Sequence, residues 1–107
     1  MKLPCSVLRL SMAAAVLFCQ AAFAHAPVFD CYIDSDDWVK CEAGFTDGST
    51  AAGRKIHVRD MSDKVLLEGT VGQDNTYRFQ PPSGSYSVLF LGGDGHDVTI
   101  QSSDISK

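Results

Sequence analysis

The chain has 107 residues, a formal net charge of −4 at pH 7 and 45% hydrophobic residues. This length fits a single domain. The acidic balance disfavours nucleic acid and anionic membranes as partners, because both attract basic surfaces, and it leaves cations as the natural ionic partners.

Residues 1–24 have the layout of a secretory signal peptide. A short basic region precedes an apolar run over residues 10–18, and small residues stand at positions −3 and −1 of a cut after Ala24. A membrane anchor is disfavoured because the apolar run is too short to cross a bilayer. Lipoprotein processing at Cys19 is disfavoured because Phe18 stands where a small residue is needed.

Removal of this leader predicts an exported protein, periplasmic or secreted, with 83 of the 107 residues (25–107). Two basic residues and no acidic residue leave with the leader. Seven basic and 13 acidic residues therefore remain, for a net charge of −6. No later apolar stretch is long enough to cross a bilayer, so no membrane span is expected in the mature chain.

Two of the four cysteines, Cys31 and Cys41, follow the leader. An oxidising compartment favours a disulfide between them over a pair of metal thiolates. Residues 34–37 (Asp-Ser-Asp-Asp) are typical of a hairpin turn, and a hairpin centred there would place the two cysteines directly opposite each other. We expect a disulfide that closes a short loop and stabilises the fold by about 2–3 kcal/mol.

The rest of the mature chain is predicted to form strands and turns, because apolar and polar residues alternate and no helical stripe occurs. Seven strands are expected, over residues 28–33, 38–45, 56–59, 64–69, 77–79, 86–91 and 98–100. This spacing indicates an all-β fold, a small seven-stranded Ig-like (prealbumin-like) sandwich over residues 25–101. Residues 102–107 are expected to be a polar tail that frays. Trp38 is expected in the core and His57 on an exposed strand face.

Strand counting also places the connections. If the seven strands alternate in direction, the mature N-terminus shares one end of the sandwich with three turn segments, residues 46–50, 72–75 and 92–95. His96 would open the last strand at that same end.

Cleavage after Ala24 would make His25 the first residue, with an α-amine of pKa about 8 and an imidazole of pKa about 6.5. The amine and Nδ1 could close a six-membered chelate ring on one metal ion. A second imidazole would complete a three-nitrogen set that suits Cu(II), and less specifically Ni(II) or Co(II). His96 is the natural candidate. Pro27 has no backbone N–H, which disfavours a square-planar site built from the first peptide nitrogens.

Asp94, Asp97 and Asp47 are secondary candidates, as oxygen ligands or as groups that orient an imidazole. A simpler interpretation stays open at each position. His25 could be an accident of processing and His96 a polar residue at the exit of a turn. Asp47 precedes Gly48, which is ordinary turn chemistry.

Several short motifs follow one another along the chain: Phe45-Thr46-Asp47-Gly48, Val58-Arg59-Asp60, Leu66-Leu67-Glu68-Gly69, Tyr77-Arg78-Phe79 and Gly93-Asp94-Gly95-His96. With the His-Ala start at residue 25, they resemble the small periplasmic accessory subunit of nickel and cobalt energy-coupling-factor uptake systems. They also resemble the wider carboxypeptidase-regulatory-like β-sandwich group. The resemblance implies an exported metal-handling role beside a membrane transporter, with His25 and His96 as ligands. Pro27 stands where members often carry another His, and their C-terminal membrane helix has no counterpart here, which favours a free periplasmic metal binder.

Two functions are therefore predicted. The first is a periplasmic binding protein for a divalent transition metal ion (Cu, Ni or Co), acting as a chaperone or uptake accessory. Its partner would be a membrane metal transporter or another periplasmic protein. The alternative is a metal-free β-sandwich module that binds another protein. No enzyme is expected, because the chain has no Ser–His–Asp arrangement and no phosphate loop. An oxidative copper enzyme built on His25 is disfavoured by the small size of the chain.

Overall fold

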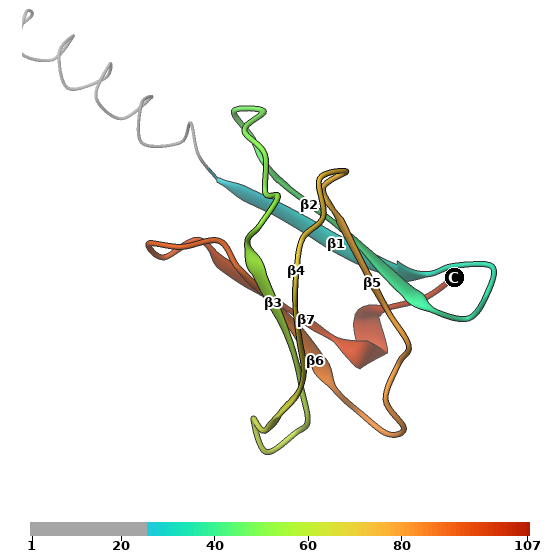
Figure 1. Ribbon diagram of the computed structural model, residues 1–107. Coiled ribbons are helices and arrows are strands. Elements are labelled where there is room, and N and C mark those ends of the chain that lie inside the picture. Colours follow the sequence, from blue (N-terminus) through green and yellow to red (C-terminus); the bar gives the residue numbers. More distant parts are fainter. Residues whose placement is uncertain (1–25) are drawn as a thin grey trace, which may run out of the picture.

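The computed structural model describes residues 26–107, which form seven strands and one short 3-10 helix (Figure 1). The elements are β1 (Pro27–Ile33), β2 (Val39–Phe45), β3 (Lys55–Arg59), β4 (Val65–Thr70), β5 (Thr76–Phe79), β6 (Ser87–Leu91), β7 (Asp97–Gln101) and η1 (Ser102–Asp104). Every predicted strand is present, and each boundary lies within one residue of its expected position. The all-β prediction is confirmed.

The strands form two antiparallel sheets, one with the order β1-β2-β5 and the other with the order β4-β3-β6-β7. Alternation explains how the sheets meet. Ile56 and Val58 of β3 are fully buried, whereas the residues between and beside them face outward. Phe90 of β6 is also fully buried and stacks on Phe29 of β1, with 5.3 Å between ring centroids. The two sheets therefore share one apolar core, as in a β-sandwich.

The disulfide between Cys31 and Cys41 is present, as predicted. The two residues are directly opposite each other in the β1–β2 register, with 4.1 Å between their Cα atoms. Both side chains are buried in the core. In the turn between the strands, Oδ1 of Asp34 accepts hydrogen bonds from the backbone N–H groups of Asp36 and Trp38. This local bonding explains why the four polar residues form a hairpin turn.

The prediction that Trp38 lies in the core is wrong. Trp38 is half-buried, and the guanidinium carbon of Arg78 lies 4.5 Å from its ring centroid. Arg78 Nε donates to Asp34 Oδ2 at 2.6 Å, and Nη2 donates to Asp36 Oδ2 at 3.0 Å. The indole stays at the surface because it provides a face for a cation that is itself held by two carboxylates.

The outward direction predicted for His57 is correct, but its exposure is not. Only 15% of the side chain is accessible. Nδ1 lies 3.0 Å from Arg59 Nη2, and Nε2 lies 3.2 Å from Glu68 Oε2. Arg59 can only donate, so Nδ1 is the acceptor and Nε2 carries the hydrogen. Both ring nitrogens of His57 are therefore engaged by neighbouring side chains.

The C-terminal segment is packed against the sandwich instead of fraying. Ile105 is buried in the core. The carbonyl of Ser106 accepts a hydrogen bond from the N–H of Ile33 at 2.9 Å, and the N–H of Ser102 donates to the carbonyl of Tyr86. One apolar residue in a polar run is enough to attach the segment, because its burial is combined with backbone hydrogen bonds on both sides.

At the edge where β4 and β5 meet, the ring of Tyr77 lies against the backbone of Gly69, in the space that a Cβ atom would occupy. A glycine in β4 therefore permits a tyrosine of the other sheet to cover this side of the core. Burial raises the pKa of the Tyr77 hydroxyl. In residues 26–107, no helix has the length and apolar character needed to cross a membrane.

Candidate functional site

The connections that strand counting assigned to one end of the sandwich do lie together there. Backbone and side chain of Thr46 are hydrogen bonded to the backbone of Ala26, just before β1. Asn75 Oδ1 accepts hydrogen bonds from Thr50 Oγ1 at 2.7 Å and from the N–H of Ala51 at 2.9 Å. We call this the pocket end; it consists of Ala26 and the segments 46–54, 72–75 and 92–96.

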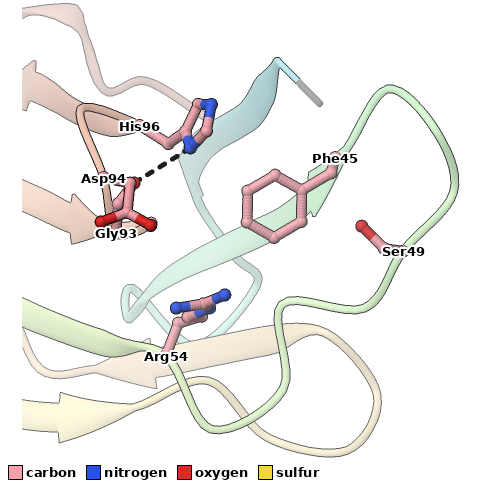
Figure 2. Close-up of a pocket in the computed structure, with 7 residues that line it drawn as sticks. Phe45, Ser49, Arg54, Gly93, Asp94 and His96 are labelled. Atoms are coloured by element: carbon pink, nitrogen blue, oxygen red, sulfur yellow. Dashed lines mark hydrogen bonds between the residues drawn. The ribbon is translucent and has the colours of Figure 1, made fainter. Parts of the chain in front are cut away.

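A pocket of about 200 Å³ opens at the pocket end. It is lined by Phe45, Ser49, Arg54, Gly92, Gly93, Asp94 and His96. Figure 2 shows the imidazole of His96 and the guanidinium of Arg54 at opposite sides of the hollow, with the Phe45 ring and the segment 93–94 forming the other two sides. The rings of Phe45 and His96 meet edge-on, with 6.3 Å between their centroids. The Arg54 guanidinium carbon lies 5.9 Å from the centroid of the Phe45 ring.

The turn before β7 fixes the orientation of His96. Gly93, Asp94 and Gly95 have φ values of 82°, 47° and 80°, a run of left-handed conformations that curls the chain back on itself. The carbonyl of Gly93 consequently faces His96, and it accepts hydrogen bonds from the backbone N–H at 2.9 Å and from Nδ1 of the ring at 3.0 Å (Figure 2). The glycine-rich sequence is thus what positions the ring.

This hydrogen bond also assigns the hydrogens of the imidazole. A carbonyl oxygen can only accept, so Nδ1 of His96 must carry a hydrogen. In the neutral ring the lone pair is then on Nε2, which points away from the Gly93 carbonyl in Figure 2. Histidines that bind metals commonly donate their other ring N–H to a carbonyl or carboxylate in this way. His96 can therefore act as a ligand through Nε2, whereas both nitrogens of His57 are engaged.

The structure separates the three secondary candidates. Asp94 lines the pocket together with His96. Asp97 lines an adjoining hollow that His96 does not reach, because successive residues entering β7 point to opposite sides. Asp47 Oδ1 accepts hydrogen bonds from the N–H of Ser49 at 2.9 Å and its hydroxyl at 2.6 Å, the bonding of a turn residue.

The donor set in the described part of the chain is small. Between residues 26 and 107, no three His, Cys, Asp or Glu side chains gather in a group that could hold a metal ion. His96 supplies one nitrogen and Asp94 a neighbouring carboxylate. A three-nitrogen site at this end needs two further donors, which is the number that His25 would bring. His25 lies outside the described residues.

Arg54 is a site residue that the sequence-based prediction missed. Its side chain is exposed at the pocket, and within residues 26–107 no carboxylate lies at ion-pair distance from it. Hydrogen bonds from its N–H to the carbonyl of Ala51 and from the N–H of Val71 to its carbonyl hold its backbone. Strand counting does place Arg54 at the pocket end, because it lies two residues before the third predicted strand (56–59) and directly before β3, but nothing in the sequence marks it as a binding residue.

No protein-family model, curated protein or solved structure matches the chain. The resemblance to the accessory subunit of nickel and cobalt uptake systems, and with it any role assigned by family, therefore stays a prediction.

Proposed function

We propose that the mature protein is an exported, periplasmic binding protein for a divalent transition metal ion, acting as a chaperone or uptake accessory. The ligands are the α-amine and imidazole of His25 and Nε2 of His96. The observation that carries the proposal is the hydrogen bond from Nδ1 of His96 to the Gly93 carbonyl. That bond leaves the Nε2 lone pair available in a ring whose orientation is already set.

The position of β1 supports the pairing of the two histidines. Pro27 is opposite Phe45 in the β1–β2 register, and the Phe45 ring contacts His96. The strand that follows residue 25 therefore begins at the pocket end. A metal held there would be bound by nitrogen donors from the two ends of the mature sandwich sequence, so that binding would require both the processed N-terminus and the folded domain.

Export is supported by two independent features. The leader pattern over residues 1–24 has the order of a signal peptide, and the buried disulfide between Cys31 and Cys41 is of a kind that persists in oxidising compartments. The nitrogen donors alone do not select among copper, nickel and cobalt. Divalent copper is expected to bind most tightly in vitro, following the general order of stability for such ligands.

The test is a titration of the processed protein, its N-terminus at His25 verified by mass spectrometry, with Cu(II) and with Ni(II). His96→Gln is expected to weaken binding at least tenfold, and acetylation of the α-amine of His25 to do the same because the terminal chelate ring is lost. His57→Gln is the matched control, and it should bind as the parent does. Electron paramagnetic resonance of the Cu(II) complex should report nitrogen ligands.

Equal binding by the parent and the acetylated protein would contradict the terminal chelate. Equal binding by the parent and His96→Gln would show that His96 is not a ligand, and the proposed site would be wrong.

A second function is favoured by a different observation, the apolar surface of the edge strand β4. Val65, Leu66 and Leu67 are each about 40% exposed, and Met61 in the preceding turn is 67% exposed. Exposed apolar groups on a sheet edge are typical of protein contacts. This supports a metal-free interaction module. Binding of a periplasmic protein in the presence of a chelator, lost in Leu66→Lys and retained in His96→Gln, would establish that function.

A further inference from the structure

The positive charge of Arg54 is unfavourable beside a site for a free metal cation. Arg54 shares the pocket with His96, and no carboxylate of residues 26–107 lies at ion-pair distance from it. A permanent positive charge in the same pocket repels a bare cation. The same charge attracts an anion, and the planar fork of N–H groups on arginine is shaped for a carboxylate.

The pocket holds Arg54 in place from two sides. Its guanidinium carbon lies 5.9 Å from the Phe45 ring centroid, which is a cation–π contact. Nη1 also lies against Gly93, so close that a Cβ atom added there would be 3.0 Å from it. Gly93 is the residue whose carbonyl orients His96. The anion-binding group and the metal-binding group are therefore supported by the same short segment.

The size of the pocket also exceeds what an ion requires. Its volume of about 200 Å³ is many times the roughly 10–15 Å³ that a cavity needs to hold one water molecule. The lining combines the aromatic face of Phe45 with the Ser49 hydroxyl and three charged or ionisable side chains, those of Arg54, Asp94 and His96. Such a mixed lining suits a small organic molecule with an apolar body and polar ends.

We propose that the pocket recognises the metal as a small chelate that carries a free carboxylate, with the metal bound by His96 and the carboxylate by Arg54. This rests on the proposed metal-binding function and specifies the form in which the ion is taken. The guanidinium then compensates the negative charge of the chelate. The chelator belongs to the class of small amino-acid-like acids with one acidic group left over after the metal is bound.

Glutamate and glutamine complexes of Ni(II) provide a matched pair of probes. Each amino acid holds the ion through its α-amine and α-carboxylate, and they differ only in the distal group, a free carboxylate or an amide. Calorimetric titration of the processed protein is expected to show about tenfold tighter binding of the glutamate complex, the size of one charge-assisted hydrogen-bonded contact. Amide shifts of Gly93 by NMR should locate the contact.

Arg54→Gln is expected to abolish this preference and to tighten binding of aqueous Ni(II), because the repelling positive charge is removed. Arg54→Lys keeps the charge but lacks the planar fork, so it should retain only part of the preference. Lys64→Gln is the matched control, because it removes one positive charge from an exposed turn residue that does not line the pocket. Its preference should equal that of the parent.

Two results would overturn the proposal, and they differ in whether the metal-binding function is also wrong. If the parent binds aqueous Ni(II) through His96 but binds both complexes equally, or if Arg54→Gln keeps the preference, carboxylate recognition is wrong and the metal-binding function remains. If the parent binds neither aqueous Ni(II) nor either complex, the metal-binding function fails and the chelate proposal fails with it.

Discussion

Two arginines, at opposite ends of the sandwich, each lie against an aromatic ring, and only one of them is neutralised. At the end formed by the β1–β2 turn, which we call the hairpin end (residues 34–38, Arg78 and Lys107), Arg78 covers Trp38 and bonds to two aspartates. At the pocket end, Arg54 lies near Phe45 with no acidic partner in residues 26–107. The comparison separates an arginine whose charge is neutralised within the fold from one whose charge no carboxylate of residues 26–107 neutralises.

The two histidines of the described chain show the same contrast. His57 uses both ring nitrogens, toward Arg59 and Glu68, and only 15% of its side chain is accessible. His96 uses Nδ1 alone, for the Gly93 carbonyl. Arg54 and His96 thus both lie at the pocket end, where backbone hydrogen bonds hold their segments and each side chain keeps polar groups that form no hydrogen bond within residues 26–107. This is the arrangement expected of a binding site built on turns that a rigid sandwich supports.

The largest expected effect comes from removing the disulfide, which crosslinks β1 and β2. The variant Cys31→Ala/Cys41→Ala should lose about 2–3 kcal/mol of unfolding free energy, because a ten-residue separation is no longer closed in the unfolded chain. Urea denaturation measures this loss. The folded fraction should bind Ni(II) as the parent does. If binding weakens in parallel with stability after correction for the unfolded fraction, the pocket end depends on the crosslink and the two ends are not independent.

Alanine at Gly93 is expected to have the next largest effect. Gly93 has φ of 82°, where a Cβ atom is unfavourable, so Gly93→Ala should cost about 1–2 kcal/mol. The new methyl group would also displace Arg54 Nη1 and disturb the carbonyl that orients His96. Gly84→Ala is the control, since Gly84 has the same φ but open space around it.

The two alanine variants should lose similar stability in thermal unfolding, and only Gly93→Ala should lose metal affinity. Weakened metal binding in Gly84→Ala as well would show that the effect is general loosening of the fold and not local to the pocket.

The smallest expected effect is the difference in stability between the glutamine variants of the two arginines. Arg78→Gln should lower stability measurably, whereas Arg54→Gln should leave it unchanged. The hydrogen bond from Arg78 holds the pKa of the Asp34 carboxyl below its ordinary value. A carboxyl with a depressed pKa stabilises the fold above its unfolded pKa of about 3.9, and this contribution is lost as pH falls through the folded-state pKa.

Urea unfolding between pH 2 and pH 6 therefore should show the parent and Arg78→Gln differing at the upper end of the range and converging in acid. A constant difference across the range would mean that Arg78 acts by covering Trp38 and not through the carboxylates.

The strands could be predicted because alternation and turn residues are local signals. In the strand Lys55–Arg59, for example, apolar and polar residues alternate, so only one orientation of the strand buries both Ile56 and Val58. The same regularity allowed strand counting to place His96 at the end where β1 begins. Conversely, the partners of long side chains were not predictable. Arg78 reaches Asp34, which is 44 residues away in sequence, and that contact is what keeps Trp38 at the surface.

The candidate site was predictable only in part for a related reason. Spacing brought Asp94 and His96 to one turn, but the outward direction of Asp97 and the turn bonding of Asp47 depend on side-chain geometry. Arg54 was overlooked because a lone arginine after a glycine has no distinctive pattern. Arg54 stands out only because no carboxylate of residues 26–107 pairs with it, and that depends on the folded structure.

The attachment of the C-terminal segment has a practical consequence for handling the protein. Ser106 bonds to Ile33 and Lys107 Nζ lies 3.1 Å from Asp37 Oδ1, so the chain finishes beside the β1–β2 turn, marked C in Figure 1. A purification tag, fluorophore or surface tether joined after Lys107 would project from the side remote from Phe45 and His96. A tag joined ahead of residue 25 would instead occupy the amine on which the proposed chelate depends. Immobilised preparations should accordingly be attached through the C-terminus when metal uptake is to be measured.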